Sequence, residues 1–445
     1  MENVDGRPIG SDEAAALFAA LRGRRGVALA VSGGADSTAL LFLYHRARAL
    51  DPTLPPAVVV SVDHRLRAEA AAEVAAVARR AVSLGLSHRA LTWDEAAAGG
   101  NLQARAAAAR RRLLLAATRE RGADTLLLAH HADDQAETVL ARLARGSGVV
   151  GLAAMAAWRD EGDVAIVRPL LAIPKSRLIA TLRAAGWDWI EDPSNRDERF
   201  LRARLRAAGP VLEELGLTRE RLVETARVMA RAAAALETLV DDLAARTVGT
   251  HPAGWAWIDR AGFGAAPAEI RLRLLARLAR SVAGAEHAPR LDGLEAIEAA
   301  ALSGAARVVR TLAGVRFEVR GGRIWLAGEG GRTPERLELA PGAQGVWRGR
   351  RVRLGGEAPS TVTIAPLGAD GRRAMIAAGA GESLAGLSPR PSAAVIESAA
   401  AVFVEGRVVA CPDLGRLGGD DRFAVEMAGF GLAKVGGGTG DPASR

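Results

Sequence analysis

The feature that most constrains the fold is an alternation, in the N-terminal part of the chain, between short apolar runs and longer runs of helical periodicity. The apolar runs that we expect to be strands are Val27–Val31, Ala57–Val62, His88–Trp93, Asp124–Ala129 and Val164–Val167. The helical runs that follow the first four are Ser37–Leu50, Ala68–Leu84, Asn101–Arg121 and Asp133–Arg145. Strands that alternate with helices are typical of an α/β fold, so the sequence predicts a twisted parallel sheet with helices on both faces.

The sequence pattern changes twice in the rest of the chain. After Pro210 the pattern is almost wholly helical to about Ala301, and from Gly304 short β-like runs are joined by Gly-Gly turns. We predict a catalytic domain over 22–208, a helical domain over 210–303 and a β-rich region over 304–435. The β-rich region has two arginine clusters, which either neutralise phosphates or are solvated strand faces. Their members are Arg307, Arg310, Arg316, Arg320 and Arg323, and then Arg348, Arg350, Arg351 and Arg353.

A glycine-containing loop joins the first predicted strand to the first predicted helix. It comprises Ser32, Gly33, Gly34, Ala35, Asp36 and Ser37. The two glycines let the backbone turn tightly and approach an anion, and the first turn of the helix presents N–H groups that suit phosphate. Asp36 is an anion itself, so its place in a phosphate loop makes sense if Mg²⁺ lies between its carboxylate and the phosphates.

The loop is not a Walker A sequence, because no lysine lies near it. Its string SGGADS, between an apolar strand and a helix, resembles the signature of the PP-loop superfamily. Members of that superfamily split ATP between the α and β phosphates, adenylate a carbonyl-type oxygen and release pyrophosphate. The alternative is a plain strand–turn–helix with a capping side chain, which would not account for the whole string.

Further segments resemble the lysidine synthetase family within this superfamily, over about residues 26–206. They are Val62–Arg67 (VDHRLR), Asn101–Arg105 (NLQAR), Ala129–Thr138 (AHHADDQAET) with the continuation to Met155, and Glu191–Asp197 (EDPSNRD) with Phe200–Arg206. Three positions depart from the family pattern. Ala107 and Arg111 stand where the family has arginine and tyrosine, and Ala203 stands where it has asparagine.

These motifs place the candidate nucleotide site at the carboxyl ends of the strands, where parallel sheets bind ligands. Asp63 and His64 would flank the nucleotide, and the alternative is a turn aspartate and a surface histidine. Arg110 is the candidate phosphate contact, and the alternative is a solvated arginine face.

Asp133 and Asp134 are adjacent carboxylates that begin a predicted helix. Beside a triphosphate such a pair is costly unless a cation neutralises it, so we expect Mg²⁺ at Asp36 and Asp133. Helix capping is the alternative role, but it does not require the two preceding histidines.

Lysidine synthetases act on the wobble cytidine of the CAU-anticodon isoleucine tRNA. The resemblance implies that ATP adenylates O2 of the base and that the ε-amino group of free lysine attacks C2. Asp36, Asp133 or Asp134 could assist or steer that amino group. His130 and His131 are candidates to receive the unstacked base, and Arg202 and Arg206 are further candidate substrate contacts.

Composition is consistent with this interpretation. The net charge of +8 suits a polyanionic partner, although an arginine-rich composition alone can produce it. Cys411 is the single cysteine, and no signal peptide or long apolar stretch predicts export or a membrane span, so we expect a cytoplasmic protein. The sequence is compatible with a homodimer. The competing functions are a PP-loop tRNA thiolase, a PP-loop amide ligase and a non-catalytic RNA-binding protein.

Overall fold

The structure is a computed structural model that describes residues 6–63, 65, 70–93, 102–191, 201–285, 287–330, 335–416, 423 and 425–428. Their contacts divide them into two compact units, one on either side of the boundary between Ala235 and Leu236. None of the described helices is long and apolar enough to cross a membrane.

The first unit is built on a six-stranded sheet in the order β3-β2-β1-β4-β6-β5. The parallel strands are β1 (Val27–Ala30), β2 (Ala57–Asp63), β3 (Ser87–Thr92), β4 (Thr125–Leu127) and β6 (Val164–Val167). This sheet confirms the predicted parallel α/β fold. The edge strand β5 (Trp158–Glu161) pairs antiparallel with β6 and was not predicted, because its sequence WRDE has no apolar pattern.

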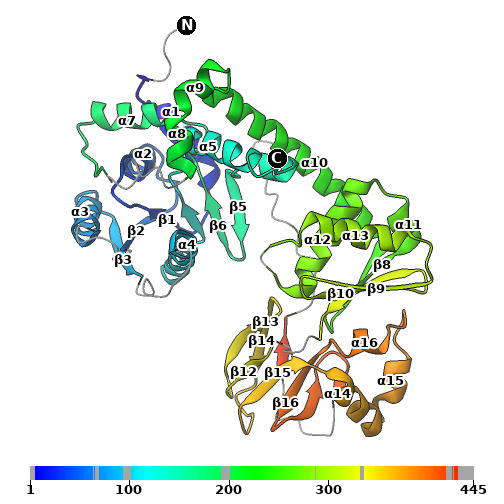
Figure 1. Ribbon diagram of the computed structural model, residues 1–445. Helices are drawn as coiled ribbons and strands as arrows, with labels where there is room; N and C mark the ends of the chain where they lie inside the picture. Colours follow the sequence, from blue (N-terminus) through cyan, green and yellow to red (C-terminus); the bar gives the residue numbers. More distant parts are fainter. Residues whose placement is uncertain are drawn as a thin grey trace. The chain divides into compact units, whose positions relative to one another are not determined.

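Helices cover both faces of this sheet because alternate side chains of each strand point to opposite faces (Figure 1). Leu29 of β1 belongs to a core that includes residues of α1 (Ser11–Phe18), α2 (Ala35–Leu50), α3 (Ala70–Ser83) and α7 (Lys175–Ala184). Ala28 and Ala30 of β1 lie in a core with Leu114 and Leu115 of α4 (Leu102–Glu120). The other helical segments are η2 (Ala19–Leu21), α5 (Ala132–Leu143), α6 (Val149–Leu152), α8 (Leu201–Ala207) and α9 (Gly209–Glu214). The long helix α10 (Arg219–Thr247) begins in the first unit and continues into the second after Ala235.

The second unit begins with a five-stranded antiparallel sheet in the order β7-β8-β11-β10-β9. Its strands are β7 (Val248–His251), β8 (Trp255–Asp259), β9 (Arg307–Leu312), β10 (Val315–Arg320) and β11 (Arg323–Gly328). One face packs in a core with residues of α12 (Ala268–Ala283) and α13 (Leu291–Leu302), which follow α11 (Arg260–Gly264). On the other face, Trp255 and Trp325 pack with Leu367, Val395 and Cys411 from the end of the chain.

Two smaller sheets complete the second unit. The first has the order β12-β15-β16-β17-β18 and the second the order β13-β14-β19. The strands are β12 (Leu337–Leu339), β13 (Gln344–Trp347), β14 (Arg350–Leu354), β15 (Val362–Pro366), β16 (Ala400–Val404), β17 (Arg407–Cys411), β18 (Gly415–Arg416) and β19 (Val425–Met427). The helical segments are α14 (Gly368–Met375), η4 (Ile376–Ala380), α15 (Gly381–Ala385) and α16 (Ala393–Ile396).

The expectation of an almost wholly helical segment from 210 to about 301 is wrong for β7 and β8. Strand β8 pairs with β11, so that Trp257 lies opposite Trp325. β8 also pairs with β7 in a hairpin that turns between His251 and Trp255, so Pro252 and Gly254 were a local turn signal that the helical interpretation did not use. The boundary between the two units, at Ala235 and Leu236, lies inside the segment predicted as a helical domain. The pairing of β8 with β11 joins residues on both sides of the predicted domain boundary at 303.

The second arginine cluster also differs from its prediction as a set of phosphate contacts. Arg350 is buried and donates to the carbonyl of Ala428 and to Asp413. Arg348 lies over the ring of Trp347, with its Cζ 4.8 Å from the ring centroid. These two arginines make their contacts inside the second unit, whereas Arg351 and Arg353 remain exposed on β14.

Candidate nucleotide site

The strand order creates a crevice at the carboxyl end of β1. After β1 the chain passes through α2 to β2 on one side, and β4 lies on the other side of β1. The connections that leave β1 and β4 therefore diverge, and ligands of open parallel sheets bind at such a switch point. The loop Ser32–Gly34 follows β1 and the segment His130–Asp134 follows β4, so the fold brings together the two strongest predicted motifs.

Hydrogen bonds within the loop fix the backbone around an anion-binding end of α2. The hydroxyl of Ser37 donates to the carbonyl of Gly34 (3.1 Å) and accepts the N–H of Ser32 (3.2 Å). The hydroxyl of Thr38 donates to the carbonyl of Gly33 (3.1 Å). Gly34 is the N-cap of α2, and the first N–H groups of a helix have no carbonyl partner within it, so this end suits a phosphate.

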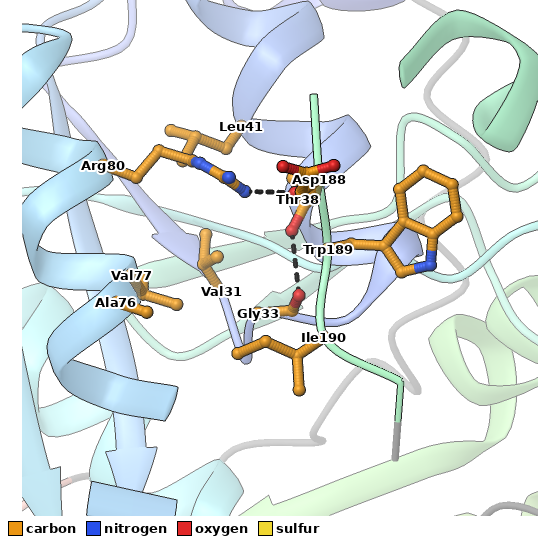
Figure 2. A pocket seen from close by; sticks show the side chains of 10 residues that line it. All are labelled: Val31, Gly33, Thr38, Leu41, Ala76, Val77, Arg80, Asp188, Trp189 and Ile190. Carbon is orange, nitrogen blue, oxygen red and sulfur yellow. Dashed lines mark hydrogen bonds between the residues drawn. The ribbon is translucent and has the colours of Figure 1, made fainter. Parts of the chain in front are cut away.

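A short segment, Asp188–Ile190, lies against the outside of the loop (Figure 2). The N–H of Ile190 donates to the carbonyl of Gly33 (2.9 Å), and Arg80 of α3 donates to the carbonyl of Asp188. Between this segment, α2 and α3 is a cavity of about 140 Å³ with mainly apolar walls. Gly33 has φ of +92°, and a Cβ there would lie 2.7 Å from Cδ1 of Ile190.

We expect Gly33→Ala to lower ATP affinity by at least about tenfold and to destabilise the fold by roughly 1–3 kcal/mol, because alanine is strained at this φ and would displace Ile190. Gly23→Ala is the matched control: its φ is +80° and nothing lies within 4 Å of its Cβ position. Calorimetric titration with ATP and thermal unfolding measure the two effects. Equal ATP affinity in both variants would show that the contact with Ile190 does not shape the loop.

The carboxylate of Asp36 points to the segment that follows β4 and to the start of α7. Its Oδ2 lies 3.0 Å from Nζ of Lys175 and 3.5 Å from Nε2 of His131. His131 is almost fully buried, and its ring also lies 3.5 Å from Oδ2 of Asp133 and 3.4 Å from Oδ2 of Asp134. One imidazole therefore stands among three carboxylates.

Charge fixes the protonation state of this cluster. Burial lowers the pKa of His131, but hydrogen bonds to Asp133 and Asp36 and the charge of Asp134 outweigh it and raise the pKa to about 9. Burial raises the pKa of Asp133, but His131 and the N–H of Lys175 lower it to about 2, and His131 and Lys175 likewise lower the pKa of Asp36. At neutral pH the site holds an imidazolium ion at His131 and ionised carboxylates at Asp36 and Asp133. The Nδ1 atom of an imidazolium cannot accept the N–H of Asp134, which lies 3.4 Å from it, so the cap that remains at the start of α5 is the bond from the N–H of His131 to Oδ2 of Asp134 (3.2 Å).

Three arginines extend the cluster. Arg206 makes an ion pair with the buried Glu137, with Nη2 and Oε2 3.1 Å apart. Arg219 of α10 lies 3.7 Å from Oδ1 of Asp133, and Nε of Arg168 lies 3.3 Å from Nδ1 of His130. Arg206, predicted as a substrate contact, is thus held at the edge of the site by Glu137.

The structure shows fewer contacts for the remaining residues that the sequence analysis predicted for the site. The carboxylate of Asp63, at the end of β2, accepts the N–H of Arg65 (2.8 Å). Arg110 lies half-buried on α4, where burial lowers the pKa of its guanidinium. His64 and the side chain of Arg202 lie outside the described part of the chain. Their roles stay predictions.

Mg²⁺ fits the site at one atom in particular. Oδ1 of Asp36 is buried and has no hydrogen-bond partner among the described residues. Over the same residues, no three His, Cys, Asp or Glu side chains gather as a metal site on their own. The unpartnered oxygen of Asp36 fits the usual Mg²⁺ site, in which one or two carboxylates act together with substrate phosphates. Asp133 fits less well, because its Oδ2 already accepts the N–H of Lys175 (2.9 Å).

Lys175 is the residue that the sequence interpretation missed. It contacts Asp36 through its side chain and Asp133 through its backbone. One signal was available in the sequence: among 59 lysines and arginines, only Lys175 and Lys434 are lysines.

Fold and site together define a nucleotide-binding domain of the PP-loop class, and residues 10–212 match the PP-loop domain family. Curated relatives extend the similarity beyond that domain. The tRNA(Ile)-lysidine synthase of Methylobacterium nodulans is 45% identical over 312 residues, which cover 68% of this chain and 90% of that protein. The tRNA(Ile)-lysidine synthase of Bradyrhizobium diazoefficiens is 41% identical over 351 residues, covering 74% of this chain and 96% of that protein. The chain belongs to the tRNA(Ile)-lysidine synthase family.

The structure of the U34-tRNA thiolase NcsA from Methanococcus maripaludis is also similar. It has a TM-score of 0.42 and 17% identity, and the match covers 49% of this chain and 78% of that one. This similarity is too low to bear on activity.

Proposed function

We propose that the protein joins free lysine to C2 of the wobble cytidine of CAU-anticodon tRNA(Ile), with ATP as the activating substrate. O2 of the base bonds to the α-phosphorus of ATP and pyrophosphate leaves. The ε-amino nitrogen of lysine then bonds to C2, and AMP leaves with the former O2. Membership of the tRNA(Ile)-lysidine synthase family supports this reaction, and a tRNA-modifying enzyme would act in the cytoplasm.

The observation that carries the proposal is the position of Asp36 at the phosphate-binding end of α2, with one buried oxygen unpartnered among the described residues. Backbone N–H groups of the loop and of the first turn of α2 would bind the phosphates. Asp36 would hold Mg²⁺, which when bound neutralises charge on the triphosphate. Adenylation needs this kind of charge stabilisation more than it needs a protein nucleophile.

The lysine substrate must approach as a cation and react as an amine. Asp36 and Asp133 have lowered pKa values, so they are weak bases at neutral pH. Ionised carboxylates attract an ammonium group, and steering is therefore the role that suits these two. Removal of the Asp133 carboxylate should therefore raise the KM for lysine and leave the pH dependence of the rate unchanged.

A sulfur-transfer reaction is the runner-up, and the state of Cys411 argues against it. The thiol is fully buried in the second unit and donates to the carbonyl of Ala400, with Sγ and O 3.0 Å apart. Burial and the charge of Asp413 raise its pKa to about 12, so it is not a nucleophilic thiolate.

The direct test supplies the enzyme with ATP, radiolabelled lysine and unmodified tRNA transcripts. We expect label to enter the CAU-anticodon isoleucine transcript, with one AMP and one pyrophosphate formed for each lysine. A methionine transcript with the same CAU anticodon is the matched control and should stay unlabelled. The proposal would be contradicted if no lysine were transferred to any tRNA. It would also be contradicted if, with lysine left out, label from a radiolabelled sulfur donor entered the RNA.

A further inference from the structure

Lys175 occupies a position that links the two halves of the nucleotide site. It is the first residue of α7, directly after Pro174. Its Nζ lies 3.0 Å from Oδ2 of Asp36, which follows β1, and its N–H donates to Oδ2 of Asp133, which follows β4. The backbone contact fixes where the side chain starts, and the side chain reaches into the phosphate loop.

The ammonium group shares its acceptor with a second cation. Oδ2 of Asp36 also lies 3.5 Å from the imidazolium of His131, whereas Oδ1 has no partner among the described residues. A divalent cation at Oδ1 would repel the ammonium group across a single carboxylate. ATP arriving with that cation brings negatively charged oxygens to the same loop. Binding of the nucleotide with its cation would therefore weaken the contact between Lys175 and Asp36 and offer Lys175 a new contact with phosphate oxygens.

The side chain is free to make this exchange. Lys175 is 44% exposed, and its charge sits on a flexible four-carbon stem. Arg177 shows the contrast on the same helix: it is 7% exposed and donates to both oxygens of Glu13. Of the two cations in the first turn of α7, Arg177 is thus fixed in the core and Lys175 lies at the site.

We propose that Lys175 is a phosphate-binding residue that leaves Asp36 for the triphosphate oxygens when ATP binds, and that it stabilises the pyrophosphate group as it leaves. The inference rests on the proposed function only in requiring ATP as a substrate. In ligand-free enzyme Lys175 holds the Asp36 carboxylate, and in the complex it neutralises the nucleotide. Asp36 is then free for the metal ion.

The test must separate this role from that of a residue that only positions Asp36. Binding of α,β-methylene ATP, which is not cleaved between those phosphates, is measured by calorimetry in EDTA without tRNA or lysine. Lys175→Met is compared with the parent protein, and again in an Asp36→Asn background where no carboxylate remains to be positioned. Arg183→Met, which removes an exposed charge near the end of the same helix, is the control.

We expect Lys175→Met to weaken binding by about 10- to 150-fold in both backgrounds, the range for a lost hydrogen bond to a charged group. Lys175→Arg should restore binding to within a few-fold, and Arg183→Met should leave it unchanged. Lys175→Gln replaces Lys175→Met if the methionine variant does not fold. A loss below about twofold in the Asp36→Asn background would overturn the proposal and leave Lys175 as a positioning residue. Because no tRNA or lysine is present, this outcome is independent of which acceptor the enzyme modifies.

Discussion

Asp36→Ala is expected to lower ATP-dependent pyrophosphate release by at least about 10²–10³-fold, the loss typical of a removed electrostatic group in an active site. The variant loses the carboxylate that contacts Lys175 and His131 and that has an oxygen available for Mg²⁺. Release of pyrophosphate in the presence of tRNA and lysine is the measurement. The Mg²⁺ dependence of the residual activity should also weaken.

Asp12→Ala provides the matched control for this change. Asp12, like Asp36, is an acidic residue in the first turn of a helix, but it is exposed on α1. We expect normal activity from it and an unchanged melting temperature. Near-normal turnover by a folded Asp36→Ala protein would remove the metal-binding role proposed for Asp36.

The second large effect is expected in tRNA binding from the exposed face of β14. Arg351 and Arg353 project outward between the buried residues Arg350, Val352 and Leu354. Each phosphate contact contributes roughly 0.7–0.9 to the slope of log affinity against log salt. If both arginines contact tRNA, Arg351→Glu/Arg353→Glu should weaken binding about 10- to 100-fold at low salt and flatten the slope by roughly 1.4–1.8.

A filter-binding titration at several salt concentrations measures both quantities. Arg373→Glu/Arg390→Glu, an equal change of charge at exposed positions elsewhere in the second unit, should change both only slightly. Glu426 lies opposite Arg353 across β14 and β19. A separate Glu426→Gln change in the parent protein removes this negative charge and is therefore expected to tighten tRNA binding. If the two double variants lost the same affinity, the effect would come from net charge, and the β14 face would not be a binding surface.

Local sequence patterns predicted most of the strands and helices of the first unit. The strand Val164–Val167 was predicted with its observed bounds, and the helix after the phosphate loop begins two residues before its prediction. Both elements are marked by apolar periodicity and by glycine, which act over a few residues. The motifs also predicted a nucleotide site at the carboxyl ends of the strands, but the order of the strands was not predicted.

Contacts between residues that are distant in the sequence could not be predicted from such local patterns. The ion pair of Arg206 with Glu137 and the contact of Lys175 with Asp36 depend on how α7 and α8 return to the sheet. In a chain with so many arginines, charge alone did not separate Arg350, which is buried, from Arg351, which is exposed. Burial is decided by strand register, and register was not predicted here.

The pairing of β8 with β11 has a consequence for how the chain folds as it leaves the ribosome. β8 emerges early, but its partner ends at Gly328, and the residues that cover Trp255 include Val395 and Cys411. Until those segments have been synthesised, a strand edge and a tryptophan face stay without their partners. The first unit, whose sheet is complete by Val167, can therefore fold during synthesis, whereas the second must wait for nearly the whole chain. Chains that stop between β8 and Cys411 are the ones we expect to aggregate or to be held by chaperones.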